Sequence, residues 1–176
     1  MAPKNIKEFR DGLHTALRAH GFQRRTLGPN LPATWELAGV EVVPRYFPQE
    51  IRRAWGFNLT GSVAVELPEF REWLNARYPA AKQGFFRGFF VSWFLANDRD
   101  FDFLTVEGEE APFDDWVDRV KSRLQGLPQT LDGLVAAYQR QDPSLRGLSS
   151  GINAKAWDFL VEWSSRRDTQ EPVPTA

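Results

Sequence analysis

This sequence of 176 residues contains no cysteine and only two histidines, His14 and His20, which lie six residues apart. Without thiolates, the chain has no disulfide bonds and no zinc or iron–sulfur site built on cysteine. Histidine and cysteine carry out most proton transfer, nucleophilic attack and transition-metal binding near neutral pH. We therefore favour a protein without a cofactor or metal ion, and a non-catalytic function over an enzymatic one.

Long apolar segments and a large excess of one charge are also absent. The longest apolar run, residues 85–96, is interrupted by Arg87 and is too short to span a bilayer. The first residues lack the apolar region of a signal peptide, and the net charge of −1 does not suit a general nucleic-acid binder. These absences predict a cytoplasmic protein that does not enter membranes.

The residues that are present suit a single folded domain. The composition is 42% apolar and 14% aromatic, which is enough to build a core in a chain of this length. We predict one α+β domain over residues 1–166 and a disordered tail over residues 167–176, where the sequence becomes polar and contains proline.

The spacing of apolar residues predicts the secondary structure. Helical spacing indicates an N-terminal helix over residues 4–20, a short helix from Pro68 to before Pro79, and three helices in the last third. Alternating or continuous apolar residues predict five strands, at residues 34–37, 40–43, 55–67, 89–96 and 101–106. The predicted fold is thus an antiparallel sheet of about five strands, packed by the N-terminal helix and a C-terminal group of helices.

Three residues in the predicted sheet constrain its geometry. Pro44 and Pro48 cannot donate backbone hydrogen bonds, so we expect them on an edge strand or at a bulge. Gly61 is expected at a bend of the strand over residues 55–67.

Two motifs resemble catalytic or metal-binding sequences but lack essential parts. Residues 147–151 match the G-x-S-x-G nucleophile elbow, yet no strand precedes them and no histidine follows, so a helix-capping loop is the better interpretation. Asp98, Asp100, Asp102 and Glu109 match calcium ligand positions of an EF-hand, but Phe103 stands where glycine is required. We therefore interpret these carboxylates as the solvated face of a strand.

Charge is unevenly distributed along the chain. Residues 1–30 carry six Lys or Arg against two Asp or Glu, whereas residues 97–119 carry nine Asp or Glu against two Arg. One basic and one acidic end would favour a protein partner or self-association, although two solvated surfaces without a partner are an open alternative.

Arginines interleaved with aromatic residues define the candidate binding residues. This pattern can hold single-stranded nucleic acid, but no RNP-type consensus is present, and such arginines also pack on aromatic neighbours of a sheet. Alternatively, four of them could line a pocket at the mouth of the sheet (Arg45, Arg53, Trp55 and Trp93), with Asp100 or Asp102 as general base. The full candidate set is Arg24, Arg25, Arg45, Arg53, Trp55, Trp93, Asp100 and Asp102.

Two short stretches resemble a bacterial family of domains of unknown function. Residues 17–25 are similar to the family's first helix, which ends in a Gly-Phe-basic turn, and residues 55–61 to its Phe-x-x-Asn-Leu-like strand. The resemblance covers about the first 65 residues, and it departs from the pattern at Thr60, where glycine is common, and in the linker before Trp35. It implies a small α+β protein with no established activity.

Together these observations predict a non-catalytic bacterial interaction protein, such as an inhibitor or immunity-type partner of another protein. Two alternatives stay open: a small-molecule-binding or enzymatic pocket at the mouth of the sheet, and binding of single-stranded nucleic acid.

Overall fold

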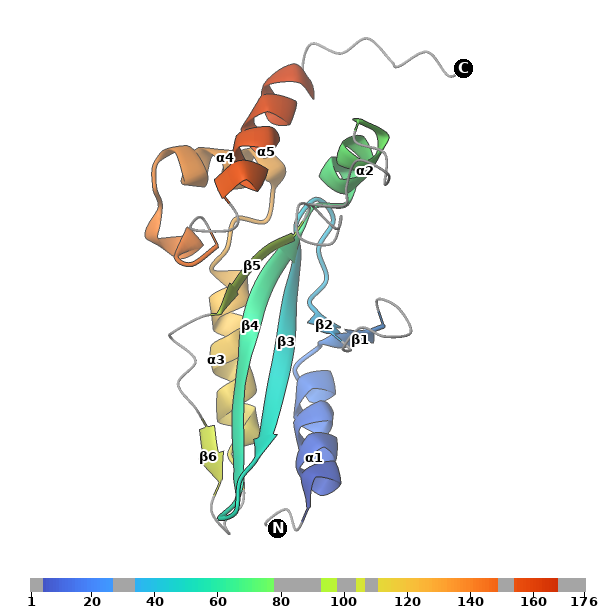
Figure 1. The fold of residues 1–176 in the computed structure, drawn as a ribbon, viewed down its shortest axis with the longest axis vertical. Coiled ribbons are helices and arrows are strands. Elements are labelled where there is room, and N and C mark those ends of the chain that lie inside the picture. Colours follow the sequence, from blue (N-terminus) through green and yellow to red (C-terminus); the bar gives the residue numbers. More distant parts are fainter. Residues whose placement is uncertain are drawn as a thin grey trace.

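The computed structural model describes residues 5–26, 34–77, 93–97, 104–106, 111–148 and 154–167. A six-stranded antiparallel sheet forms the centre of this part of the chain, with helices on one face and at one end (Figure 1). The strands are β1 (Gln23–Arg25), β2 (Thr34–Glu36), β3 (Val43–Arg52), β4 (Phe57–Glu66), β5 (Trp93–Asn97) and β6 (Leu104–Val106). The helices are α1 (Ile6–Ala19), α2 (Pro68–Arg77), α3 (Phe113–Gln125), α4 (Leu131–Gln139), the 3₁₀ turn η2 (Pro143–Leu145) and α5 (Ala154–Arg167).

The predicted α+β class is confirmed, with an antiparallel sheet, an N-terminal helix and C-terminal helices. The number of strands is six rather than about five, because β1 was not predicted. Its three residues are all polar and exposed, so no apolar alternation marks them. Arg167, expected in the tail, is the last residue of α5, and residues 168–176 lie outside the described part.

The β3–β4 hairpin is the centre of the sheet, with ten residue pairs from Val43–Glu66 to Arg52–Phe57. The predicted strand over residues 40–43 is therefore wrong except for Val43, because β3 begins at that residue and runs on to Arg52. The Pro44 carbonyl accepts a hydrogen bond from the Leu37 N–H (3.1 Å), so its backbone polar groups face β2, away from β4. Pro48 has the same orientation in the strand, beyond the residues that β2 pairs. Neither proline removes a β3–β4 hydrogen bond. The expected edge strand or bulge is nevertheless wrong, because β3 lies between β2 and β4 and pairs with β4 in unbroken register.

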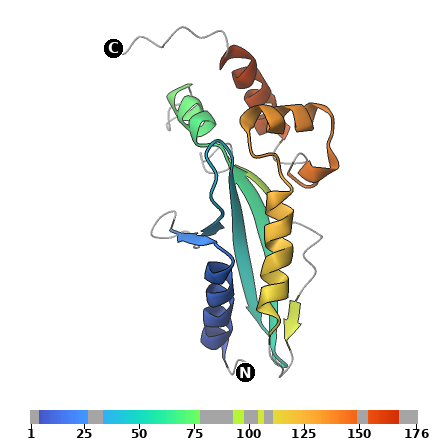
Figure 2. The ribbon, with the colours of Figure 1, turned by 180° about the vertical axis from the view of Figure 1, so that it is seen from behind.

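Helices α1 and α3 cover one face of the sheet (Figures 1 and 2). Their predicted apolar stripes are confirmed, since Phe9, Leu13 and Leu17 of α1 are buried, as are Trp116 and Val120 of α3. This helix-covered face of the sheet, called the core face below, belongs to a continuous apolar cluster that also includes residues of α2, α4 and α5.

A buried tyrosine on β3 ties the core face to α3. The Tyr46 hydroxyl accepts a hydrogen bond from Trp116 Nε1 (3.0 Å) and donates one to the Thr60 carbonyl (3.2 Å). Burial raises the pKa of the Tyr46 phenol. The ring fits because Gly61 lies beneath it: a Cβ at Gly61 would lie 2.4 Å from Tyr46 Cε2. Gly61 thus allows the Tyr46 ring to pack closely against the backbone of β4.

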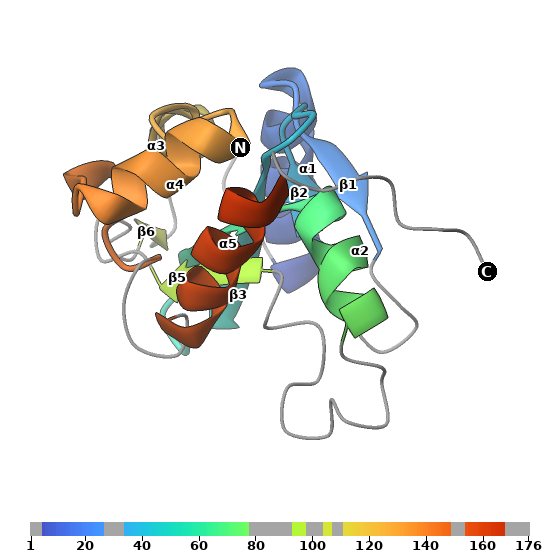
Figure 3. The same cartoon turned by 90° about the horizontal axis from the view of Figure 1, so that it is seen from above.

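The remaining helices gather at one end of the hairpin, where α5 lies beside α2 (Figure 3). Phe70, Trp73 and Trp163 join these two helices, with ring centroids 5.5 to 6.3 Å apart. On α4, Tyr138 stacks on Trp157 of α5 at 4.5 Å. The predicted helices of the last third are therefore confirmed.

Several predictions fall on residues outside the described part. They concern the capping serines at 149–150, the carboxylates Asp98, Asp100, Asp102 and Glu109, and the first half of the strand at 89–96. The second half of that strand belongs to β5 (Trp93–Asn97). Within the described ranges, no helix is long and apolar enough to cross a bilayer.

Candidate functional site

The face of the sheet opposite α1 and α3 carries a row of charged side chains. Strand pairing places Glu36 beside Arg45, and Val43 beside Glu66, so these side chains share one face. Because side chains alternate along a strand, Arg25 on β1 lies on that face as well. We call this the charged face.

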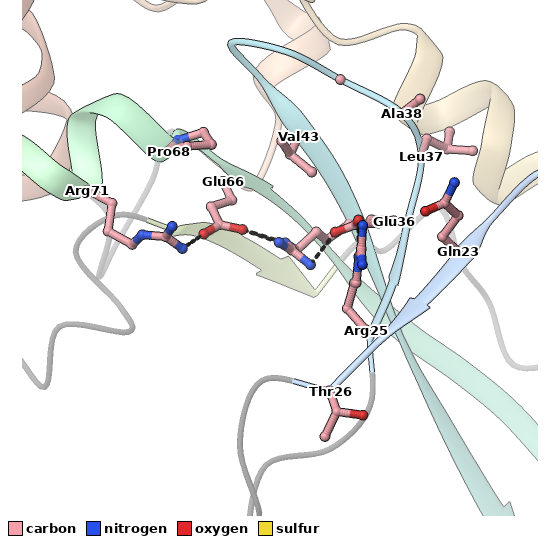
Figure 4. Close-up of a pocket in the computed structure, with 12 residues that line it drawn as sticks. Gln23, Arg25, Thr26, Glu36, Leu37, Ala38, Val43, Glu66, Pro68 and Arg71 are labelled. Carbon is pink, nitrogen blue, oxygen red and sulfur yellow. Dashed lines mark hydrogen bonds and ion pairs between the residues drawn. The ribbon is translucent and has the colours of Figure 1, made fainter.

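These four charged side chains and Arg71 of α2 form a continuous row of alternating charge (Figure 4). Arg45 donates from Nε to Glu66 Oε2 at 2.8 Å, and its Nη1 lies 2.7 Å from Glu36 Oε2. Arg25 Nε donates to the other oxygen of Glu36 at 2.5 Å, and Arg71 of α2 donates to the other oxygen of Glu66. The row therefore runs Arg25–Glu36–Arg45–Glu66–Arg71 across four strands and a helix.

The inner members of this row are buried, so their charges depend on one another. The Glu66 side chain is 2% exposed and that of Arg45 is 9% exposed. Burial lowers the pKa of the Arg45 guanidinium, and the Glu36 carboxylate opposes this shift. Arg45 nevertheless stays a cation at any physiological pH. A buried charge is tolerated only when it is paired, which explains why Glu36 and Glu66 flank it.

The two outer arginines differ from Arg45 because they are accessible. The Arg25 and Arg71 side chains are 57% and 41% exposed. Each uses one nitrogen in the row, and among the described residues no partner contacts their other guanidinium nitrogens. Each arginine therefore still has several N–H donors to offer.

Both outer arginines line one cavity of about 500 Å³ (Figure 4). Its wall comes from β1, β2, β3, the end of β4 and the start of α2, and includes Gln23, Thr26, Ala38 and Pro68. Three arginines and two glutamates line it, so these groups carry a net charge of 3 − 2 = +1. A polar wall with a positive excess suits a carboxylate better than an apolar ligand.

The structure brings together only part of the predicted binding set. Arg25 and Arg45 both line the cavity, and Trp93 begins β5 opposite Glu66. Arg24 is exposed and points, by strand alternation, to the other face of the sheet. Asp100 and Asp102 lie outside the described residues.

The predicted pocket that combined Arg45 with Arg53 and Trp55 is not assembled. Arg53 and Trp55 lie in the β3–β4 turn, where Trp55 is 50% exposed. Arg45 is eight residues away along an extended strand, which corresponds to about 26 Å. These residues lie at opposite ends of the hairpin, and the strand keeps them apart.

Three members of the row were missed by sequence reasoning, namely Glu36, Glu66 and Arg71. Glu66 had a detectable signal, because it interrupts the apolar run Val63-Ala64-Val65-Glu66-Leu67. A charged residue in a strand that is otherwise buried points to a buried partner. Arg71 had no such signal, because its contact depends on how α2 packs against the sheet.

A second charged cluster joins α1 to α3. His20 Nε2 lies 3.1 Å from Asp114 Oδ1, and His20 Nδ1 lies 2.8 Å from Asp118 Oδ1. Lys121 Nζ also donates to the His20 carbonyl at 2.9 Å. The basic N-terminal segment and the acidic segment therefore meet within the molecule at this point. In the described ranges, no group of three or more His, Asp or Glu residues could hold a metal ion.

Comparisons of the chain with protein-family models, curated proteins and solved structures find no match. The resemblance to a bacterial family of unknown function therefore stays a prediction, and the functional argument rests on the cavity alone.

Proposed function

We propose that this protein is a non-catalytic interaction protein that binds an acidic side chain of a partner protein in the cavity of the charged face. The observation that carries this proposal is the pair of outer arginines, Arg25 and Arg71, which line one cavity with unused donors. Arginine recognises carboxylates through parallel N–H donors, often two at a time.

The arrangement of the cavity favours binding over catalysis. Each oxygen of Glu36 and Glu66 is contacted by an arginine. Both carboxylates are thereby already engaged as acceptors within the row. The two glutamates therefore serve to position the arginines.

In this proposal, the protein acts by covering an acidic surface of its partner, as an inhibitor or immunity-type protein does. It keeps the expectation of a cytoplasmic bacterial protein that the sequence suggested. The uneven distribution of charge along the chain contributes less support, because the N-terminal segment and the acidic segment contact each other at His20.

A small carboxylate metabolite is the second candidate ligand, since the volume of the cavity lies within the range of small-molecule sites. It would be bound by Arg25 or by Arg71. The two candidates differ in whether a carboxylate within a peptide is enough for binding.

Arginine side-chain NMR signals would test the proposal. The labelled protein would be titrated with the blocked peptide acetyl-Thr-Glu-Thr-amide, with glutarate, and with acetyl-Thr-Gln-Thr-amide as the uncharged control. The double variant R25Q/R71Q removes the two guanidinium groups that line the cavity. As a control, R52Q/R53Q removes two positive charges at exposed positions, the last residue of β3 and the first of the β3–β4 turn.

We expect the Glu peptide to shift the signals of the native protein and of R52Q/R53Q in a saturable manner, and to have no effect on R25Q/R71Q. A response to glutarate alone would replace the protein partner by a small carboxylate. No response to either probe would refute binding of carboxylates at this cavity.

A further inference from the structure

We infer that the cavity takes an extended acidic segment of the partner with two carboxylates four residues apart, one bound by Arg25 and the other by Arg71. This inference rests on the proposed function and names the ligand of the same site.

The charged face offers two separate cationic ends and no single anion pocket. Arg25 is attached to the row through Glu36, and Arg71 through Glu66, with the buried Arg45 between them. In Figure 4, Arg71 and Glu66 lie on one side of the row, and Glu36 and Arg25 on the other. One carboxylate therefore cannot satisfy both accessible arginines unless the row breaks.

The length of the row limits the spacing of the ligand's charges. Four consecutive ion pairs, with group centres about 4 Å apart, separate the outer guanidinium groups by at most about 16 Å. In an extended peptide, side chains of residues i and i+4 lie on one side, about 13 Å apart. Flexible glutamate side chains cover the remaining distance. Residues i and i+2, at about 7 Å, fall short of a fully extended row.

Helical ligands do not fit this spacing. On a helix, side chains at i and i+4 have Cβ atoms only about 6 Å apart. A helical segment with carboxylates at this spacing would therefore reach one end of the row and leave the other arginine without a partner. For carboxylates four residues apart, the geometry favours an extended segment over a helical one.

The middle of the row also restricts the ligand. Between the outer arginines lie the carboxylates of Glu36 and Glu66, and the charge of Arg45 is already matched by them. A third carboxylate at residue i+2 of the ligand would face these glutamates and be repelled. The central residue of the ligand should thus be uncharged.

Three blocked peptides of equal length would test this ligand class by calorimetric titration. Acetyl-Glu-Thr-Thr-Thr-Glu-amide has the inferred spacing, acetyl-Glu-Glu-Thr-Thr-Thr-amide has adjacent charges, and acetyl-Glu-Thr-Glu-Thr-Thr-amide has a spacing of two. Each would be added to the native protein, to the single variants R25Q and R71Q, and to R53Q as a control in the β3–β4 turn.

We expect the first peptide to bind the native protein and R53Q about fivefold more tightly than the other two, the size of one additional exposed ion pair. In R25Q and R71Q that advantage should vanish, leaving three equal and weaker affinities.

Equal affinities of the three peptides for the native protein, all weakened by R25Q or R71Q, would overturn the two-carboxylate ligand and leave the proposed function standing. An advantage that survives in either single variant would overturn it as well. If no peptide binds the native protein at all, the inference and the proposed function are both wrong. The melting temperature of each variant shows whether it is folded, which keeps loss of binding distinct from loss of structure.

Discussion

The two faces of the β3–β4 hairpin bury polar groups in different ways. On the core face, the Tyr46 hydroxyl is satisfied by neutral partners, Trp116 and the Thr60 carbonyl. On the charged face, Arg45 and Glu66 are buried as ions and satisfy each other. One pair of strands therefore supports an apolar core on one side and a fixed set of charges on the other.

This difference indicates which face of the hairpin is accessible to a ligand. The core face is covered by α1 and α3. The charged face ends in accessible arginines, and its buried centre holds them in place. Substitutions that remove a buried polar contact should consequently lower the stability of the protein by different amounts on the two faces.

The largest effect is expected on the charged face. E66Q removes the carboxylate that contacts Arg45 and Arg71, so the buried Arg45 loses one of its two carboxylate partners. We expect a loss of about 3–5 kcal/mol in the free energy of unfolding, measured by urea denaturation.

The double variant R45M/E66M is the matched control, because it removes both charges and keeps comparable volume. It should recover most of the loss. If E66Q unfolds at the same urea concentration as the native protein, the row does not stabilise the fold.

A smaller effect is expected on the core face. Y46F removes the acceptor of Trp116 Nε1 and leaves that buried N–H without this partner. The expected loss is about 1–3 kcal/mol by the same denaturation experiment. Y138F, which removes the hydroxyl of a half-buried tyrosine that stacks on Trp157, should change stability by less. Equal losses in both variants would show that the Tyr46 hydrogen bonds contribute nothing specific.

The smallest expected effect is the contribution of His14 to the pH dependence of stability. Burial lowers the pKa of His14 below its ordinary value of 6.5, and Arg24, Arg18 and Arg10 add to the shift. The unfolded chain then binds the proton more readily than the folded one. The His14 contribution to stability is therefore complete above pH 6.5 and is lost as the pH falls from 6.5 through the folded pKa.

H14Q tests this linkage, because glutamine does not titrate in that range. Melting temperatures measured between neutral and mildly acidic pH should fall less steeply with decreasing pH in H14Q than in the native protein. An unchanged or steeper fall would contradict the sign of the shift. H20Q is the comparison at the other histidine, which lies between Asp114 and Asp118.

Most of the helices and one of the two longest strands, β4, were predictable. The stripes of α1 and α3 repeat every three or four residues, and the strand over residues 55–67 alternates well enough to locate β4, observed as Phe57–Glu66. Local spacing suffices wherever an element buries one side. Strand β1 and the extension of β3 through Pro48 could not be found in this way, because short polar strands and prolines have no apolar periodicity.

The candidate site was predictable only in part. Arg25 and Arg45 were singled out as binding residues, but they were grouped with Arg53 and Trp55, which lie at the far end of the hairpin. Sequence spacing does not tell which residues of different strands become neighbours. That depends on the register, which pairs Glu36 with Arg45 and Val43 with Glu66.

By itself, the sequence determined the α+β class, the positions of the amphipathic helices and the chemistry available without cysteine. These follow from composition and from periodicity within single elements, which neighbouring residues impose on one another. Only the tertiary structure decided that Arg25, Glu36, Arg45, Glu66 and Arg71 form one row beside a cavity. The row needs four strands in register and α2 packed at their end, and such contacts arise between residues that are distant in the chain.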